Sequence, residues 1–313
     1  MKRIEGSHLF PKDVPMPALA LGNFDGVHLG HQKLIRKIKD EAKATAGTSV
    51  VYTFDPHPVS VLSPSQCPKL INTLEQKLSN LEASGVNITV VEKFTHEFSR
   101  QEPKTFFKNI IIDRMHPRTI IVGYDYTFGL HRHGTIETLE KLGKKNDIRV
   151  IIVPAAFSDE TLISSTVIRR MIVEGSVEQA ATLLGRPYEI AGKVVAGLGI
   201  GRTLAARTAN IISENEIMPS DGVYITMTAI EDEILFPSIT NIGDNPTIPE
   251  SSYSIETHII DKDLDILGKN ITVSFLTRMR EELRFATLDE LKAQIARDID
   301  EAREYHRQQG EKR

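Results

Sequence analysis

Residues 18–31 read ALALGNFDGVHLGH, and this stretch decides the fold class of the first half of the chain. Its first four residues form a compact apolar run of the kind found in buried strands. The run ends in Gly22-Asn23-Phe24-Asp25-Gly26, a composition typical of a turn. We expect a helix from the second histidine, His31, because apolar residues then recur at helical spacing over residues 34–42. The stretch therefore predicts a strand, a glycine-bearing loop and a helix.

Short apolar runs and amphipathic segments alternate from this stretch to about residue 186. Strands are predicted at residues 18–21, 49–54, 86–91, 119–122 and 150–153. Thr73-Leu74-Glu75-Gln76 has the form of a capping box, and Gly85 is placed to end the helix that it opens. Strands that alternate with helices pair in parallel through right-handed crossovers. The first half therefore predicts a doubly wound α/β fold with a parallel sheet.

After about residue 186 the pattern changes to closely spaced strands. These are predicted at residues 222–230, 234–242, 255–260 and 271–276. Thr287-Leu288-Asp289-Glu290 then has the form of a capping box at the start of a last helix. The pattern predicts a small antiparallel β-barrel, or a sandwich of the same strands, with a C-terminal helix. We place the domains at 1–186 and 187–313, joined near Gly185-Arg186-Pro187.

The composition excludes several classes of protein. The 313 residues fit two domains, and 40% hydrophobic with 26% charged residues is ordinary for a soluble protein. A net charge of −4 argues against a protein that coats nucleic acid. The single cysteine, Cys67, excludes a disulfide framework and a cysteine-clustered zinc site. With no signal peptide and no apolar run of membrane-spanning length, we expect a cytoplasmic protein without membrane or nucleic-acid partners.

Two histidines, His28 and His31, stand at the predicted start of the first helix. Ligands of open α/β sheets bind at the carboxyl ends of strands, where this loop lies. A helix N-terminus offers N–H groups and partial positive charge to a phosphate, and imidazoles donate further hydrogen bonds. Glycines such as Gly22 and Gly30 let a nucleotide approach the backbone. We predict a nucleotide phosphate site; the alternative is a tight turn with two surface histidines.

A second candidate phosphate site is Ile163-Ser164-Ser165-Thr166-Val167-Ile168-Arg169-Arg170, which is expected to open a helix after a strand. Ser165, Thr166 and backbone N–H groups would hold a phosphate, and Arg169 would add a bidentate contact. The alternative is a well-capped surface helix with a solvated arginine.

Two aromatic loops are predicted at the same edge of the sheet. One is Thr53-Phe54-Asp55-Pro56-His57-Pro58, and the other is Val122-Gly123-Tyr124-Asp125-Tyr126-Thr127-Phe128-Gly129. Both offer flat apolar faces to a ring system. The alternative is that their aromatic residues pack in the core. The histidines show no His-x-x-x-His pattern of a metal site.

The first half resembles the FMN adenylyltransferase module of the prokaryotic bifunctional riboflavin kinase/FAD synthetase family. Residues 22–31, 53–58, 123–129 and 164–169 carry this resemblance. The wider nucleotidyltransferases and class I aminoacyl-tRNA synthetases share only His-x-Gly-His, whereas Gly-Asn-Phe-Asp-Gly-Val-His is more specific to the flavin enzymes. The resemblance implies transfer of AMP from ATP to FMN, with Mg²⁺, to give FAD and pyrophosphate.

The resemblance also implies a role for each residue of these motifs. His28, His31 and Arg169 would be catalytic, with the histidines on the ATP phosphates and the transition state. The ATP-binding residues would be Gly22, Asn23, Phe24, Asp25, Gly30, Ser165 and Thr166, of which Asn23 and Asp25 would shape the nucleotide and metal site. The flavin-binding residues would be Phe54, Asp55, Pro58, Tyr126 and Phe128.

The second half resembles the riboflavin kinase module of the same family, with one departure. The resemblance implies that Thr208 and Asn210 bind the Mg²⁺-nucleotide and that Glu256 is the base for the ribityl hydroxyl. The family's loop reads Gly-Arg-x-Leu-Gly-Phe-Pro-Thr-Ala-Asn, but here Ala205-Ala206-Arg207 replace Gly, Phe and Pro. Leu267 also stands where the family has a tyrosine. Because the altered loop orients Thr208 and Asn210, we predict absent or weak riboflavin kinase activity.

The sequence thus predicts an FAD synthetase whose substrates are ATP and FMN, with riboflavin in doubt. Three alternatives stay open. The chain would be a fully bifunctional riboflavin kinase/FAD synthetase, a nucleotidyltransferase for another phosphate-bearing acceptor, or a non-catalytic flavin-responsive binding protein. The histidine pair argues against the last, because flavin binding alone does not need it.

Overall fold

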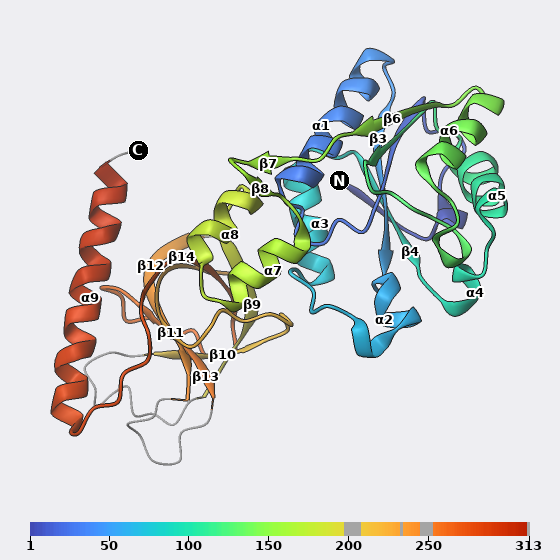
Figure 1. The fold of residues 1–313 in the computed structure, drawn as a ribbon. Coiled ribbons are helices and arrows are strands. Elements are labelled where there is room, and N and C mark those ends of the chain that lie inside the picture. Colours follow the sequence, from blue (N-terminus) through green and yellow to red (C-terminus); the bar gives the residue numbers. More distant parts are fainter. Residues whose placement is uncertain (197–207, 232–233, 245–252, 312–313) are drawn as a thin grey trace. The chain divides into compact units, whose positions relative to one another are not determined.

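The computed structural model describes residues 1–196, 208–231, 234–244 and 253–311 (Figure 1). The chain divides into two compact units, Met1–Ser165 and Thr166–Arg313. The residues between 166 and 186 are grouped with the second unit, so a domain boundary at 186/187 stays a prediction. Within the described residues, no helix combines the length and the apolar character needed to cross a membrane.

A six-stranded parallel sheet forms the centre of the first unit, in the order β1-β4-β3-β2-β5-β6. Its strands are β1 (Lys2–Glu5), β2 (Pro17–Leu21), β3 (Thr48–Asp55), β4 (Ile88–Lys93), β5 (Thr119–Gly123) and β6 (Arg149–Val153). The predicted parallel α/β sheet is confirmed. After β4 the chain crosses from the β3 side of β2 to its other side and adds β5. The carboxyl end of β2 is therefore the switch point where such sheets bind ligands.

Helices cover both faces of this sheet (Figure 1). They are α1 (Leu29–Ala44), α2 (Pro58–Leu62), α3 (Leu74–Ala83), α4 (His96–Ser99), α5 (Pro103–Phe106), the π-helical segment η3 (Phe107–Met115) and α6 (Ile136–Lys145). Short 3-10 turns are η1 (Ser7–Leu9), η2 (Pro64–Gln66) and η4 (Leu130–Arg132), and β7 (Phe157–Ser158) pairs with β8 (Thr161–Leu162).

The two faces of β2 explain why the sheet is buried on both sides. Leu19 and Leu21 belong to the core shared with η3 and α6, whereas Ala18 and Ala20 belong to the core shared with α1. Successive side chains of a strand point to opposite faces. A strand covered on both faces must therefore be apolar throughout, as this one is.

The ends of two helices agree with the sequence in most respects. Thr73 and Gln76 form the predicted capping box of α3, and Gly85 follows that helix with a φ of +77°. The predicted start of α1 at His31 was wrong, because α1 begins at Leu29 and His28 is its N-cap. The imidazole of His28 accepts the N–H of His31, a role that Ser, Thr, Asp and Asn side chains usually take at a helix start.

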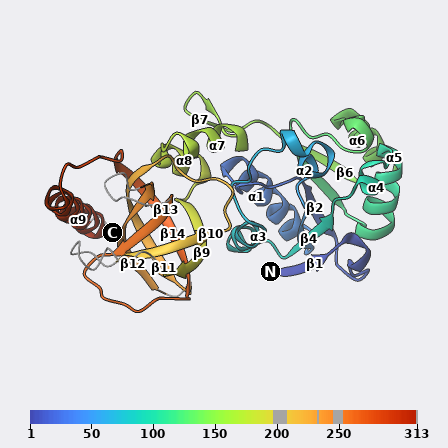
Figure 2. The same cartoon turned by 90° about the horizontal axis from the view of Figure 1, so that it is seen from below.

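The second unit contains a closed barrel, in the order β10-β13-β12-β11-β14-β9. Its elements are α7 (Ser165–Val173), which begins at the division between the units, α8 (Val177–Leu184), β9 (Tyr188–Val195), β10 (Ala209–Ser213), β11 (Gly222–Ile230), β12 (Ile234–Gly243), β13 (Ser254–Ile259), β14 (Asn270–Arg280) and α9 (Leu288–Glu311). All neighbouring strands are antiparallel, so the predicted barrel is confirmed and the sandwich is not observed (Figure 2). β9 and β10 were not predicted, because Gly192 interrupts one and the other has only five residues.

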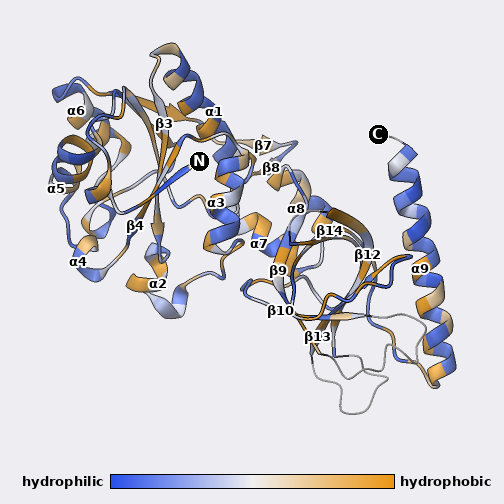
Figure 3. Cartoon of the chain, turned by 180° about the vertical axis from the view of Figure 1, so that it is seen from behind, coloured by the Kyte–Doolittle hydropathy of each residue, from blue (hydrophilic) through white to orange (hydrophobic). Residues whose placement is uncertain are grey.

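Helix α9 packs on the outside of the barrel. Val223 and Ile225 of β11 form a small core with Ala302 of α9. Figure 3 shows hydrophobic and hydrophilic residues alternating along α9, as expected of an amphipathic helix. Arg280 at the end of β14 donates to the buried carboxylate of Asp298, with an Nη2–Oδ2 distance of 2.6 Å. This ion pair fixes α9 to the strand that precedes it.

The predicted capping box of α9 is only half formed. Thr287 Oγ1 accepts the Glu290 N–H at 3.2 Å, as expected. The Glu290 carboxylate, however, accepts from the Ala286 N–H at 2.9 Å and not from Thr287. The Glu290 side chain therefore binds the N–H of Ala286, the residue before Thr287.

Candidate active site

The loop between β2 and α1 has a constrained backbone. Phe24 and Val27 have φ values of 53° and 40°, a region that L residues and above all β-branched residues rarely adopt. Both side chains are almost fully buried in the core under α1. Burial therefore holds the loop in a conformation with a cost of about 1–3 kcal/mol per residue, as is common at functional sites.

His28 and His31 are stacked at the start of α1. Their ring centroids lie 3.7 Å apart with an interplanar angle of 18°. The backbone N–H of His31 donates to Nδ1 of His28 at 3.3 Å, so that nitrogen carries no proton and the neutral ring has its N–H at Nε2. A Cβ at Gly30 would lie 2.9 Å from the His28 ring, so only glycine leaves room for this stack.

The surroundings of His31 keep its ring neutral. Burial lowers the pKa of His31 well below 6.5, and electrostatic interactions with His28 and Lys77 lower it further. A neutral imidazole still has one N–H that can donate to a phosphate. A bound polyphosphate would oppose these effects and favour the imidazolium, which stabilises negative charge.

Asp25 ties three segments together at this edge of the sheet. Its Oδ1 accepts the Ile71 N–H at 3.0 Å and the Asn72 N–H at 3.4 Å. Its backbone carbonyl accepts from the Ser165 hydroxyl at 2.9 Å. The side chain of Asp25 is buried. Its hydrogen bonds hold the loop after β2 against residues 71–72. Of the predicted pyrophosphate residues, the structure brings Ser165 to this loop.

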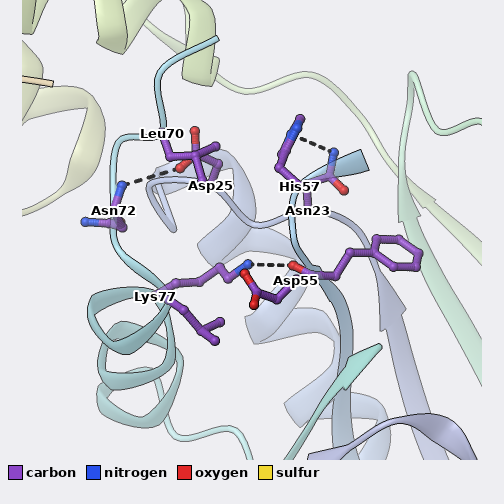
Figure 4. Close-up of a pocket in the computed structure, with 9 residues that line it drawn as sticks. Asn23, Asp25, Asp55, His57, Leu70, Asn72 and Lys77 are labelled. Carbon is purple, nitrogen blue, oxygen red and sulfur yellow. Dashed lines mark hydrogen bonds between the residues drawn. The ribbon is translucent and has the colours of Figure 1, made fainter. Parts of the chain in front are cut away.

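A pocket opens beside the loop, at the carboxyl ends of β2 and β3 (Figure 4). Its lining residues are Asn23, Asp25, Phe54, Asp55, His57, Leu70, Asn72, Leu74 and Lys77. The Nδ2 of Asn23 lies 3.3 Å from Nε2 of His57, and Lys77 Nζ donates to the Phe54 carbonyl at 3.1 Å. The structure thus brings together four predicted site residues, Asn23, Asp25, Phe54 and Asp55.

The second aromatic loop is more buried than the first. Phe128 is 7% exposed and belongs to the core beneath β2, and Tyr126 stacks on it with ring centroids 5.8 Å apart. Neither ring lines the pocket, nor does Pro58, the first residue of α2. Phe128 therefore packs in the core, which was the alternative interpretation of this loop. A contact of Tyr126 or Pro58 with flavin stays a prediction.

Thr166 and Arg169 lie on α7, in the second unit of the chain. Their predicted contact with pyrophosphate is an untested expectation. Within the described residues, no group of three or more His, Cys, Asp or Glu side chains is arranged to hold a metal ion.

Two predicted residues lie on adjacent strands of the barrel, and a third, Thr208, immediately precedes one of these strands. Asn210 of β10 is in register with Glu256 of β13. Thr208 Oγ1 donates to Glu256 Oε2 at 3.2 Å, and Ser254 Oγ donates to Oε1 at 3.1 Å. Both oxygens of the carboxylate are therefore oriented by hydroxyl groups. The altered residues Ala205-Ala206-Arg207 lie outside the described residues, and Leu267 is 63% exposed.

Comparisons with known proteins cover almost the whole chain. Family models described as FAD synthetase and riboflavin kinase match residues 11–167 and 184–306. A Bacillus subtilis bifunctional riboflavin kinase/FMN adenylyltransferase is 36% identical over 304 residues, 95% of each chain. The Escherichia coli K12 protein of the same name is 33% identical over 97% of this chain and 98% of its own. This chain belongs to the bifunctional riboflavin kinase/FMN adenylyltransferase family.

A solved structure from Streptococcus pneumoniae agrees with the fold of this family member. It is 30% identical, has a TM-score of 0.85, and covers 97% of this chain and 99% of its own. That protein is described as a macrolide-efflux protein. The residues matched by the FAD synthetase model lie almost entirely in the first unit, and those matched by the riboflavin kinase model include the barrel.

Two residues near the pocket of the first unit could not be singled out from the sequence. His57 was quoted only as part of an aromatic loop, yet it caps α2 and faces Asn23. Lys77 was not considered, because a lysine in a helix is ordinarily solvated. Its position was a usable signal, because Lys77 lies on the same helical face as Leu74 and Leu81. Leu74 is half-buried and Leu81 is fully buried.

Proposed function

We propose that this chain catalyses both reactions of its family, phosphorylation of riboflavin to FMN in the barrel and transfer of AMP from ATP to FMN in the first unit. One observation carries the adenylyltransferase assignment. The stacked pair of His28 and His31 stands at the N-terminus of α1, directly after the switch-point strand β2. Such a place supplies hydrogen-bond donors and positive potential to a phosphate.

Adenylyl transfer needs no protein nucleophile. An oxygen of the FMN phosphate attacks the α-phosphorus of ATP and forms the new P–O bond. The bond from the α-phosphorus to the oxygen that bridges it to the β-phosphorus breaks, and pyrophosphate leaves with that electron pair. Catalysis is then positioning together with stabilisation of charge on the phosphoryl oxygens. His28 Nε2–H and the His31 ring are the donors in this proposal.

The other predicted residues take supporting roles. Ser165, Thr166 and Arg169 would hold the departing pyrophosphate, and Asn23 and Asp25 would shape the nucleotide site. Magnesium would enter with ATP as part of the substrate. The substrates are then small molecules, and a cytoplasmic location stays a prediction from the sequence.

The hydrogen bonds from Thr208 and Ser254 to Glu256 support this carboxylate as the base of the kinase reaction in the barrel. Glu256 would accept the proton of the ribityl hydroxyl as that oxygen attacks the γ-phosphorus of Mg²⁺-ATP. The bond from the γ-phosphorus to the oxygen that bridges it to the β-phosphorus would break, and ADP would leave with that electron pair. Thr208 and Asn210 would bind the nucleotide. The family comparison favours the fully bifunctional alternative over our prediction of a weak kinase. That prediction rests only on Ala205-Ala206-Arg207 and stays open to test.

One experiment tests both halves. Purified protein is mixed with Mg²⁺-ATP and either riboflavin or FMN, and the flavins are separated by chromatography. We expect FAD and pyrophosphate from FMN, and FMN followed by FAD from riboflavin. FMN that binds without forming FAD would overturn the adenylyltransferase assignment. If riboflavin is not consumed and the variant A205G/A206F/R207P consumes it, the altered loop is the reason.

A further inference from the structure

Lys77 is an ammonium group inside the pocket beside the histidine loop. It lies on the first turns of α3, which the Thr73–Gln76 capping box holds in place. The side chain is half-buried and lines the pocket together with Phe54, Leu70 and Leu74 (Figure 4). Partly burying a lysine is unfavourable unless the ammonium finds partners.

The protein supplies only part of what this ammonium requires. An ammonium has three N–H donors, and the described part of the structure gives Lys77 one acceptor, the Phe54 carbonyl. Among the described residues, no carboxylate forms an ion pair with Lys77. Asp25 has an oxygen engaged by the backbone of residues 71–72, and the Asp55 side chain is exposed. The remaining donors of Lys77 are available to an anion in the pocket.

The charge of Lys77 affects the pKa of His31. It contributes to the lowered pKa of His31, although neither histidine of the pair lines the pocket. Burial in turn lowers the pKa of Lys77, against the opposing effect of Asp55 and Asp25. Asn23 and Asp25 of the loop before α1 line the same pocket, so an anion bound beside Nζ would lie next to the phosphate site at the start of α1 and not within it.

We propose that Lys77 binds the phosphate of FMN, orients it for attack on ATP and makes the first unit select FMN over riboflavin. This inference rests on the adenylyltransferase function proposed above. FMN and riboflavin differ only in this phosphate, so a cation that contacts it discriminates between them. The phosphate must also approach the negatively charged ATP, and Lys77 offsets part of that repulsion. The apolar wall of Phe54, Leu70 and Leu74 favours the flavin as the occupant of this pocket.

The test compares Lys77→Gln with Lys77→Arg in FAD synthesis from FMN. Loss of a hydrogen bond to a charged group corresponds to about a 10- to 100-fold change. We expect Lys77→Gln to raise the KM for FMN by about that factor, with the KM for ATP changed less than about 3-fold. Riboflavin is added as an inhibitor competing with FMN in the Glu256→Gln background, where the proposed base for its phosphorylation is absent. It should keep its inhibition constant because it has no phosphate. Lys77→Arg should recover most of the affinity for FMN.

Lys39→Gln is the matched control. Lys39 also donates to a backbone carbonyl, that of Ser84 at 2.8 Å, but it lies outside the pocket, so its removal should leave both KM values unchanged. A rise in the KM for ATP alone would assign Lys77 to the nucleotide, and equal weakening of FMN and riboflavin would make its role structural. Either result overturns the proposal. If the unaltered protein forms no FAD, the adenylyltransferase function itself fails, which is a distinct outcome.

Discussion

The backbone N–H of His31 donates to Nδ1 of His28, so the first imidazole caps α1 while its ring stacks on the second. This hydrogen bond fixes the His28 tautomer, in which the N–H of the neutral ring is at Nε2. One side chain thus caps the helix at the proposed phosphate site and, in our proposal, also donates to the phosphate. Substitution of His28 changes both properties, so the variants must be chosen to separate them.

His28→Asn keeps a capping acceptor and removes the imidazole. We expect FAD synthesis to fall by about 10²- to 10³-fold, the range for loss of one preorganised donor. Its free energy of unfolding should stay near that of the unaltered protein. His28→Ala should lose the same activity and in addition about 1 kcal/mol of stability, because the cap is gone. Rates of FAD formation and urea unfolding measure the two effects.

The control is His133→Ala, which removes an exposed imidazole from the turn after η4. Its FAD synthesis should be unchanged. Riboflavin phosphorylation by the barrel should be unaffected in all three variants. Normal FAD synthesis by His28→Asn would show that the cap, and not the imidazole, is what this position contributes.

His31 should make stability depend on pH. The pKa of His31 is lowered well below 6.5 in the folded protein, while the unfolded chain takes up a proton near 6.5. The unfolded state then binds more protons, so stability is complete above about pH 6.5 and falls as the pH falls below it. The slope is about 1.4 kcal/mol per pH unit for one proton.

Urea unfolding of the unaltered protein and of His31→Gln, at pH 7.5 and 5.5, measures this effect. The glutamine does not titrate, so the variant should lose less stability between the two values. Lys77→Gln should raise the pKa of His31 in an NMR titration, because it removes one of the charges that lower it. Equal losses of stability in the two proteins would contradict the assignment of a neutral His31.

The sequence predicted the fold well because hydrophobic periodicity is a local signal. The parallel sheet and four barrel strands follow from apolar runs, and the α3 cap follows from Thr73 and Gln76. The pocket was harder to predict, because its residues meet only through strand order. Lys77 lies 54 residues after Asn23 in the sequence and belongs to no motif that the sequence analysis used, yet both residues line the pocket. Phe128, by contrast, was in a motif, but its burial depends on helices that cover it in three dimensions.

Asp25 should act mainly as a hydrogen-bond acceptor. Asp25→Ala leaves the N–H groups of Ile71 and Asn72 without this acceptor, which should cost about 1–3 kcal/mol. Asp25→Asn retains an oxygen at that place, so it should lose less than about 1 kcal/mol and keep more FAD synthesis than the alanine variant. Thermal unfolding and FAD assays compare the two. If Asp25→Asn keeps its stability but loses activity as fully as His28→Asn, the charge of Asp25 takes part in the reaction.

Glu256 should separate the two activities of the chain. Its carboxylate is held by Thr208 and Ser254 through distances of 3.2 Å and 3.1 Å. Glu256→Gln removes the proposed base, so phosphorylation of riboflavin should fall by about 10²- to 10⁴-fold. FAD synthesis from FMN should remain within about 2-fold, since it takes place in the other unit.

Ser254→Ala tests whether the orientation of this carboxylate matters. Because Ser254 acts through Glu256, the variant should lower kcat for riboflavin by about 10-fold with little change in KM. Ser274→Ala is the matched control, because Ser274 also donates to a glutamate of the barrel, Glu189 at 2.7 Å. It should keep the kinase rate. We expect the same ratios of variant kcat to parent kcat when the substitutions are made in the A205G/A206F/R207P background. These ratios can therefore be measured even if riboflavin phosphorylation by the unaltered protein is slow. A kinase rate that survives Glu256→Gln in both backgrounds would remove Glu256 from the role of base.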